Sequence, residues 1–306
     1  MESWRRHPLV FWIIGLPPTF WLVVFFLVPL TLMWIMSVST KVGINDLDLN
    51  WTLDNYSRAL GWLYLEILLK SFWMAGATTL LCFAIGFPVA FAISFAPQRW
   101  KGLLLLLIIL PFWTNLLIRT YALIAVLRTR GYVNFSLEWL WEKANGFLMF
   151  VGLGEYQLLG QRFEPLELLY NNQAVLFGMT YVFLPFMILP LYAALERMDK
   201  SYIEASLDLG AGQWRTFFSV IIPLSKAGII SGIIITFIPA LGAFLQPDLL
   251  GGPDSQLIAN VIERQFKSAN DWPFGSALSF ILMYMTFGAL ALRAVLAKNS
   301  SAMEAA

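Results

Sequence analysis

Long runs without a charged residue dominate this sequence and restrict what it can fold into. Five such runs occur, at Leu9–Thr40, Ser71–Gln98, Leu168–Leu195, Ala227–Pro247 and Trp272–Leu292. Each reaches the length of about 20 residues that an α-helix needs to cross the hydrocarbon core of a bilayer. A sixth run, Gly102–Leu127, is apolar except for Arg119. Because hydrocarbon offers backbone groups no hydrogen-bond partner, we expect these runs to be helices.

The expected fold class is therefore an all-α membrane protein with six transmembrane helices in a single domain, residues 1–306. The predicted spans are about 10–38, 67–96, 103–127, 172–195, 226–246 and 274–296. Composition agrees, because 59% of the residues are hydrophobic and 13% are charged, about half the charged share of soluble domains. The apolar start of the chain is longer than a signal-peptide core and is interpreted as an uncleaved first span.

Residue counts also exclude several kinds of chemistry. The chain has one cysteine, Cys82, and one histidine, His7, which precedes the first span. A disulfide framework, a clustered metal site and a Ser-His or Cys-His nucleophile are therefore not expected. The sequence contains no Gly-Lys-Ser/Thr, so it has no P-loop to hold nucleotide phosphates. We expect a protein that is not an enzyme and holds no cofactor.

The distribution of basic residues predicts the orientation. With the N-terminus in the cytoplasm, the inside segments are about 1–8, 97–101, 196–226 and 293–306, and they hold ten Lys and Arg residues. The longer outside segments hold eight. Higher density of Lys and Arg marks the cytoplasmic side of a membrane protein. Both termini and the loop at 197–224 are thus expected in the cytoplasm, with lipid around the spans and no nucleic-acid partner.

The loop at 197–224 has the character of a short soluble helix–turn–helix between two apolar spans. Asp199 or Ser201 can cap a helix that begins near Tyr202, and Glu204 lies in its first turn, where the helix dipole favours negative charge. Gly210 and Gly212 permit a tight turn, and a second helix is expected over about 213–220. An ordinary interfacial loop would also carry such aromatic and apolar residues, so amphipathicity alone leaves two interpretations open.

The order of residues in this loop favours a coupling role. Glu204-Ala205-Ser206 is followed by three residues, Gly210, nine residues and Val220-Ile221-Ile222-Pro223. This segment resembles the cytoplasmic EAA loop of ABC-importer permeases, with Ser, Val and Ile in place of the usual Ala, Ile and Leu. The resemblance implies that the loop receives movement from a separate ATPase. The residues expected to couple to that ATPase are Glu204, Ala205, Asp208, Gly210, Ala211 and Pro223.

A wider resemblance covers most of the chain. The matching segments are Pro111–Asn115, Leu117–Tyr121, Leu184–Tyr192, Asp208–Ala211, Asp248–Gly252 and Asp271–Gly275. They resemble the polyamine (spermidine/putrescine) importer permeases. The resemblance implies the type I ABC-importer (MetI-like) permease fold in a bacterial inner membrane. It also implies a second permease subunit, an ATPase dimer that binds the ATP, an extracytoplasmic solute-binding protein and import of polyamines by alternating access.

Four residues are candidates for the substrate pathway or its support. Asp248 follows the Pro- and Gly-broken fifth run, where a carboxylate would attract ammonium groups, although it can instead cap a turn. Phe244 offers a cation–π face or a steric gate, although aromatic residues in membrane helices usually serve packing. Glu263 can add negative charge. Arg119 is expected to be a structural intramembrane charge that pairs with a carboxylate such as Glu66 or caps carbonyl groups.

Three alternatives remain at this point. The first keeps the ABC mechanism and changes the cargo to another small solute, such as an opine, thiamine, ferric ion or an oxyanion, although the acidic outer segments disfavour oxyanions. The second is a channel or an ion-coupled secondary transporter. Such proteins need ion sites within the membrane, and Arg119 is almost the sole deep charge in this sequence. A membrane enzyme is a weaker alternative, because paired carboxylates and His clusters are missing from the spans.

Overall fold

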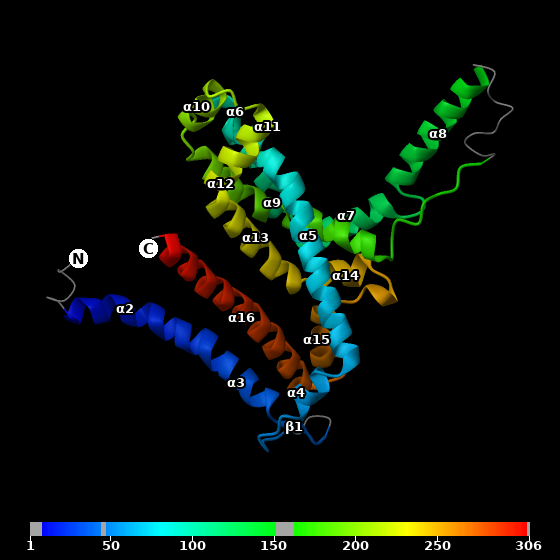
Figure 1. Cartoon of the computed structure of the whole chain (residues 1–306). Helices are drawn as coiled ribbons and strands as arrows, with labels where there is room; N and C mark the ends of the chain where they lie inside the picture. The colour runs from blue at the N-terminus through cyan, green and yellow to red at the C-terminus, as the bar shows by residue number, and fades with distance from the viewer. Residues whose placement is uncertain (1–7, 44–46, 151–161, 305–306) are drawn as a thin grey trace. The chain divides into compact units, whose positions relative to one another are not determined.

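The computed structural model describes residues 8–43, 47–150 and 162–304, and nearly all of its regular structure is helical (Figure 1). The chain divides into two compact units. One unit combines the residues up to Glu66 with those from Val261 onward, and the other is formed by Ile67–Asn260. Helices α5 (Trp62–Ser94) and α15 (Ile258–Lys267) contribute residues to both units. Each unit is described by itself below.

The unit that contains both chain ends consists mainly of long apolar helices. Its elements are α2 (Pro8–Leu22), the π-helical turn η1 (Val23–Leu27), α3 (Val28–Ser37), β1 (Thr40–Lys41), β2 (Leu47–Asp48), α4 (Asp54–Ala59) and α16 (Trp272–Glu304). Helix α16 packs along α3 and α4. The two short strands are antiparallel, with Thr40 opposite Asp48.

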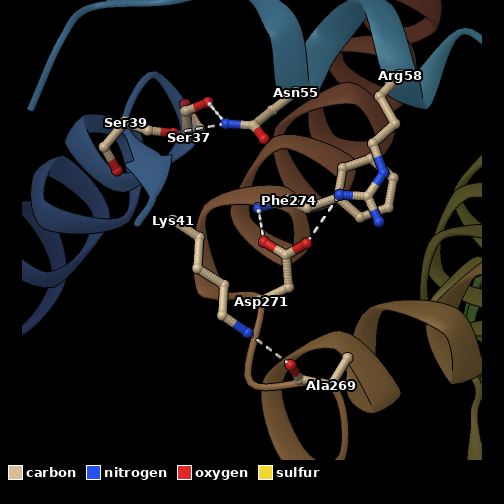
Figure 2. Close-up of polar contacts among 8 residues, drawn as sticks. All are labelled: Ser37, Ser39, Lys41, Asn55, Arg58, Ala269, Asp271 and Phe274. Atoms are coloured by element: carbon tan, nitrogen blue, oxygen red, sulfur yellow. Dashed lines mark hydrogen bonds and ion pairs between the residues drawn. The ribbon is translucent and has the colours of Figure 1, made fainter. Parts of the chain in front are cut away.

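Polar contacts hold the segments between these helices in place (Figure 2). Asn55 Nδ2 donates to the carbonyl oxygens of Ser37 and Ser39 at 3.1 and 2.7 Å, which ties α4 to the end of α3. Lys41 Nζ donates to the Ala269 carbonyl at 2.9 Å.

A second group of contacts in Figure 2 joins α4 to the start of α16. The Arg58 guanidinium lies 2.8 Å from the Asp271 carboxylate and 3.8 Å from the centroid of the Phe274 ring. Asp271 Oδ1 also accepts from the Phe274 N–H at 3.3 Å. The first turn of α16 is thus capped by a carboxylate that a cation from α4 holds in position.

The second unit contains the remaining helices. They are α6 (Gln98–Ile109), the 3₁₀ turn η2 (Leu110–Trp113), α7 (Leu116–Leu127), α8 (Tyr132–Phe150), α9 (Asn172–Glu196), α10 (Ser201–Asp208), α11 (Gln213–Thr216), the π-helical turn η4 (Phe217–Ile221), α12 (Ile222–Leu224), α13 (Lys226–Leu241), α14 (Leu245–Leu250) and the 3₁₀ turn η5 (Pro253–Ser255).

The centre of this unit is the packing of α9 against α13 (Figure 1). A Cβ atom added at Gly228 of α13 would lie 2.8 Å from the Pro190 carbonyl oxygen of α9, and one at Gly232 would lie 2.7 Å from Met187 Sδ. Both glycines are buried. Small residues allow two membrane helices to approach closely, and van der Waals packing between the helices then stabilises the pair.

The expected spans compare with the helices as follows. Three helices, Ile13–Ser37, Trp62–Ser94 and Asn172–Glu196, are long and apolar enough to cross a membrane, and two bent pairs raise the number to as many as five among the described residues. The expected third span, 103–127, is broken at Thr114–Asn115 within the pair Gln98–Trp113 and Leu116–Phe150, which is bent by 96°. Pro111 lacks an N–H, and Asn115 Oδ1 accepts from the Leu117 N–H at 2.8 Å, so a new helix begins there.

Candidate functional site

The segment between α9 and α13 forms two short helices joined by a tight turn. Asp199 precedes α10, and its Oδ1 accepts from the Ser201 N–H at 3.0 Å, as an N-terminal cap would. This hydrogen bond holds the pKa of the Asp199 carboxyl below its usual value. We call residues 199–224 the coupling segment, after the role expected from its sequence.

Gly210 shapes the turn of the coupling segment. Its φ of +81° lies in the left-handed region, which a residue with a β-carbon rarely adopts. The hydroxyl groups of Ser206 on α10 and Thr216 on α11 lie 2.9 Å apart and connect the two helices after the turn. Phe217 then packs edge-on against Phe87 of α5, with ring centroids 5.4 Å apart. The coupling segment therefore has a defined shape and a fixed attachment to the helices behind it.

The coupling segment presents a mixed surface. Glu204 and Asp208 are exposed, as are Ala205, Gly210 and Pro223, whereas Ala211 is half-buried. The apolar side chains of Leu209 and Trp214 are 89% and 77% exposed. Exposed apolar residues that are bordered by charges are typical of a protein–protein contact.

A pocket lies beside the middle of α9, about ten residues before the helix ends near the coupling segment. Its volume is about 290 Å³, and its lining comes from η2, α7, α9, α14 and the end of α13. The lining residues are Phe112, Leu116, Arg119, Val182, Phe183, Phe186, Pro239, Gly242, Ala243, Phe244, Leu245 and Gln246. Helix α13 ends at Leu241, within the Pro239–Gly242 interruption expected from the sequence. This end of the helix forms part of the pocket wall. The pocket is mostly apolar, with several aromatic faces and two long polar side chains.

The two polar side chains of the pocket both present N–H donors. Arg119 Nε is buried and has no hydrogen-bond partner, and its guanidinium lies 5.7 Å from the centroid of the Phe112 ring. Arg119 forms no ion pair among the residues that the structure describes, so the expected pairing with a carboxylate is not seen there. Gln246 is 2% exposed, and its Nε2 likewise has no partner.

The predicted pathway residues do not all come together. Phe244 lines the pocket, and its carbonyl accepts from Asn260 Nδ2 at 2.8 Å and from the Asp248 N–H at 3.1 Å. Asp248 is exposed on the next turn of α14 and lies outside the pocket lining. Glu263 belongs to the other unit, where its carboxylate pairs with Lys267 at 2.7 Å.

Several pocket residues were missed by sequence reasoning. Phe112 and Phe186 meet edge to face with centroids 5.0 Å apart, and both lie in segments that carry the family resemblance. Gln246 is a long polar residue in an otherwise apolar run, which was a usable signal. Within the described ranges, no group of three His, Cys, Asp or Glu side chains is placed to hold a metal ion.

Comparison with known proteins adds a family to this geometry. Residues 7–298 match the model of the family described as binding-protein-dependent transport system inner membrane component. Over 262 residues the chain is 41% identical to the spermidine/putrescine transport system permease protein PotB of Escherichia coli K12, covering 86% of this chain and 88% of PotB. The Haemophilus influenzae PotB is 39% identical over 259 residues, covering 85% and 84%.

A solved structure supports the fold independently. A chain of a bacterial ABC transporter involved in the import of the acidic polysaccharide alginate superposes with a TM-score of 0.65, covering 97% of this chain and 98% of that chain. The sequence identity of that pair is 14%, so the likeness concerns the fold alone.

Proposed function

The chain belongs to the family of binding-protein-dependent transport system inner membrane components, and we propose that it is the permease subunit of an importer that moves polyamines. The observation that carries the proposal is the arrangement of α9, which lines a pocket with its middle turns and leads into the coupling segment after its last residue. A permease subunit needs both, a contact for an ATPase and a wall of the substrate pathway. The relatives named as spermidine/putrescine permeases support polyamines as the cargo.

The proposed partners follow from the family and from the coupling segment. A second permease subunit would complete the pathway, an ATPase dimer would bind ATP and dock on the coupling segment, and a binding protein would deliver the solute outside. Both termini and the coupling segment would then be cytoplasmic. Short amphipathic helices dock well in grooves of partner proteins, which fits the exposed Leu209 and Trp214. The chain itself would hold no cofactor and would carry no catalytic residue.

The pocket fits passage of a polyamine better than tight binding. The rings of Phe183, Phe186 and Phe244 offer faces that attract ammonium groups through cation–π contacts. The guanidinium of Arg119 repels the same groups. A pathway must bind weakly enough to release its cargo, so such opposing contributions suit transport, and the binding protein would supply most of the specificity. Arg119 would thus be a fixed positive charge in the pocket wall and would not bind the cargo itself.

The first test measures ATP hydrolysis by the complete complex in nanodiscs. The complex is supplied with its binding protein loaded with spermidine, with putrescine or with no ligand. We expect polyamine-loaded binding protein to stimulate hydrolysis over the unloaded protein. A complex that hydrolyses ATP and responds to its binding protein but ignores polyamines would remove the cargo and leave the permease role intact.

Asp248→Asn tests the proposed attraction of cations toward the pathway. Because the substitution removes one exposed negative charge near the pocket, we expect initial polyamine uptake at low ionic strength to fall on the order of tenfold, and the deficit to shrink with added salt. Asp254→Asn is the matched control, because Asp254 is also exposed and acidic and lies six positions further along the chain. Equal uptake by both variants would return Asp248 to a turn-forming role.

A further inference from the structure

Two contacts join α6–η2 to α9, one near each end of α6–η2. At one end, Lys101 Nζ donates to both carboxylate oxygens of Glu196 at 2.7 Å. At the other end, the Phe112 and Phe186 rings meet at 5.0 Å with an interplanar angle of 73°. All four residues belong to the same unit. The two contacts therefore join the same two elements at two separate points along their length.

The two contacts are separated along the helices, so that one lies near the coupling segment and the other at the pocket. Lys101 precedes Phe112 by eleven residues and Glu196 follows Phe186 by ten, which corresponds to about 15 Å of helix in each element. Phe112 and Phe186 line the pocket, whereas Glu196 is the last residue of α9 and lies three positions before Asp199. The ion pair thus lies where the coupling segment begins, and the aromatic pair lies where the pocket begins.

The burial of Lys101 shows that this ion pair is a specific contact. Lys101 is 8% exposed, and lysine is rarely buried to this extent unless it is paired. Its neighbour Arg99, on the same turn of α6, is exposed. A second cation supports the same region, because Lys200 Nζ lies 5.3 Å from the centroid of the Phe95 ring at the end of α5. The start of the coupling segment is therefore held to the α5–α6 corner at two points.

We propose that the Lys101–Glu196 ion pair makes α6 and α9 one lever, so that displacement of the coupling segment moves two walls of the pocket together. Without the ion pair, α9 can slide past α6 when the coupling segment is displaced, and α6 and η2 then stay in place. With it, η2 and α9 shift as one body and carry Phe112 and Phe186 with them. Lys101 and Glu196 are positioning residues, since neither lines the pocket. The inference rests on the proposed permease function and adds the contact through which a displacement of the coupling segment is transmitted to the pocket.

The test compares Lys101→Met, Glu196→Gln and the double variant in the complete complex with its partner subunits. Methionine keeps the apolar stem of Lys101 and removes its buried charge. The Glu196 carboxylate that loses its partner is 34% exposed and can be hydrated, so folding is expected to be retained. Glutamine keeps the shape of Glu196 and removes only the charge. Arg99→Met is the matched control, because it removes an exposed cation from the same helix.

Two readouts separate transmission from stability. The first is polyamine uptake per ATP hydrolysed. The second is the nucleotide-dependent change in labelling of a cysteine introduced at Leu116, a pocket residue, in a Cys82→Ala background, which removes the one native cysteine of this chain. A contact that serves only the stability of the fold would lower the amount of complex and leave both readouts unchanged in what assembles.

We expect each single variant to lower uptake per ATP about tenfold and to reduce the labelling change, while ATP hydrolysis continues. The double variant should be no worse than the more impaired single variant, because both substitutions remove the same interaction. Losses that multiply in the double variant, or wild-type readouts in assembled complex, would overturn the proposal. If the unaltered complex imports no polyamine, the cargo proposal fails, and the labelling comparison still decides whether the lever exists.

Discussion

Replacing Glu204 with arginine is expected to abolish uptake while the protein remains inserted in the membrane. Glu204 is exposed in the first turn of α10, where its carboxylate is available to a partner. In the proposed complex this surface docks on the ATPase, and reversal of a charge there places like charges together. Loss of a contact worth 2 kcal/mol or more lowers affinity about thirtyfold, and reversal should exceed simple removal.

The measurement for Glu204→Arg combines three quantities: the amount of protein in the membrane, co-purification of the ATPase, and polyamine uptake. Glu142→Arg on α8 is the matched control, because Glu142 is also an exposed glutamate on a helix surface and lies outside the coupling segment. We expect normal insertion for both variants, and loss of co-purification and uptake for Glu204→Arg alone. Normal uptake by Glu204→Arg would remove the proposed role of this residue in coupling.

Gly228→Val is expected to prevent assembly of the folded protein. A side chain at Gly228 would meet Ala194 and would place its first atom 2.8 Å from the Pro190 carbonyl oxygen, which belongs to the backbone of α9 and cannot move by changing a rotamer. Helices α9 and α13 would have to separate along their contact. Overpacking typically costs about 1–3 kcal/mol, and a clash with backbone belongs at the upper end of that range or beyond.

The amount of folded protein after detergent extraction and its thermal midpoint measure this effect. Gly76→Val is the matched control, because nothing lies within 4 Å of a Cβ added at Gly76 of α5. We expect Gly76→Val to be extracted in near-normal amounts, because the added side chain meets no neighbour and glycine is the poorer helix former of the two residues. If Gly228→Val is as stable as Gly76→Val, close packing of α9 and α13 is not what holds this unit together.

The coupling segment is the part of the site that sequence reasoning described best. Its helix start at Ser201, its turn at Gly210 and the helix after Gly212 follow from capping residues and from the conformational freedom of glycine, which are local properties. The π-helical turn at Phe217–Ile221 was not anticipated. It brings Phe217 against Phe87 of α5, a contact between residues far apart in the chain.

The lining of the pocket was predicted only in part from the sequence. Phe244 and Arg119 were identified, the first as a gate and the second as a structural charge, and the fold places both in one lining. The contact between Arg119 and the Phe112 ring could not be predicted from the sequence, because it depends on the 96° bend at the break between η2 and α7. Glu263 was grouped with Asp248 by sign of charge, whereas the structure pairs it with Lys267.

Sequence alone determined that this chain carries helices apolar enough to cross a membrane and a helix–turn–helix between two of them, because run length, capping residues and turn residues act over a few neighbouring positions. Only the tertiary structure decided which side chains meet, such as Lys101 with Glu196, which are 95 residues apart. The physical reason is that lipid is as apolar as the core of a helix bundle. Hydropathy then no longer distinguishes a helix face that packs on protein from one that faces lipid, and close packing makes that choice.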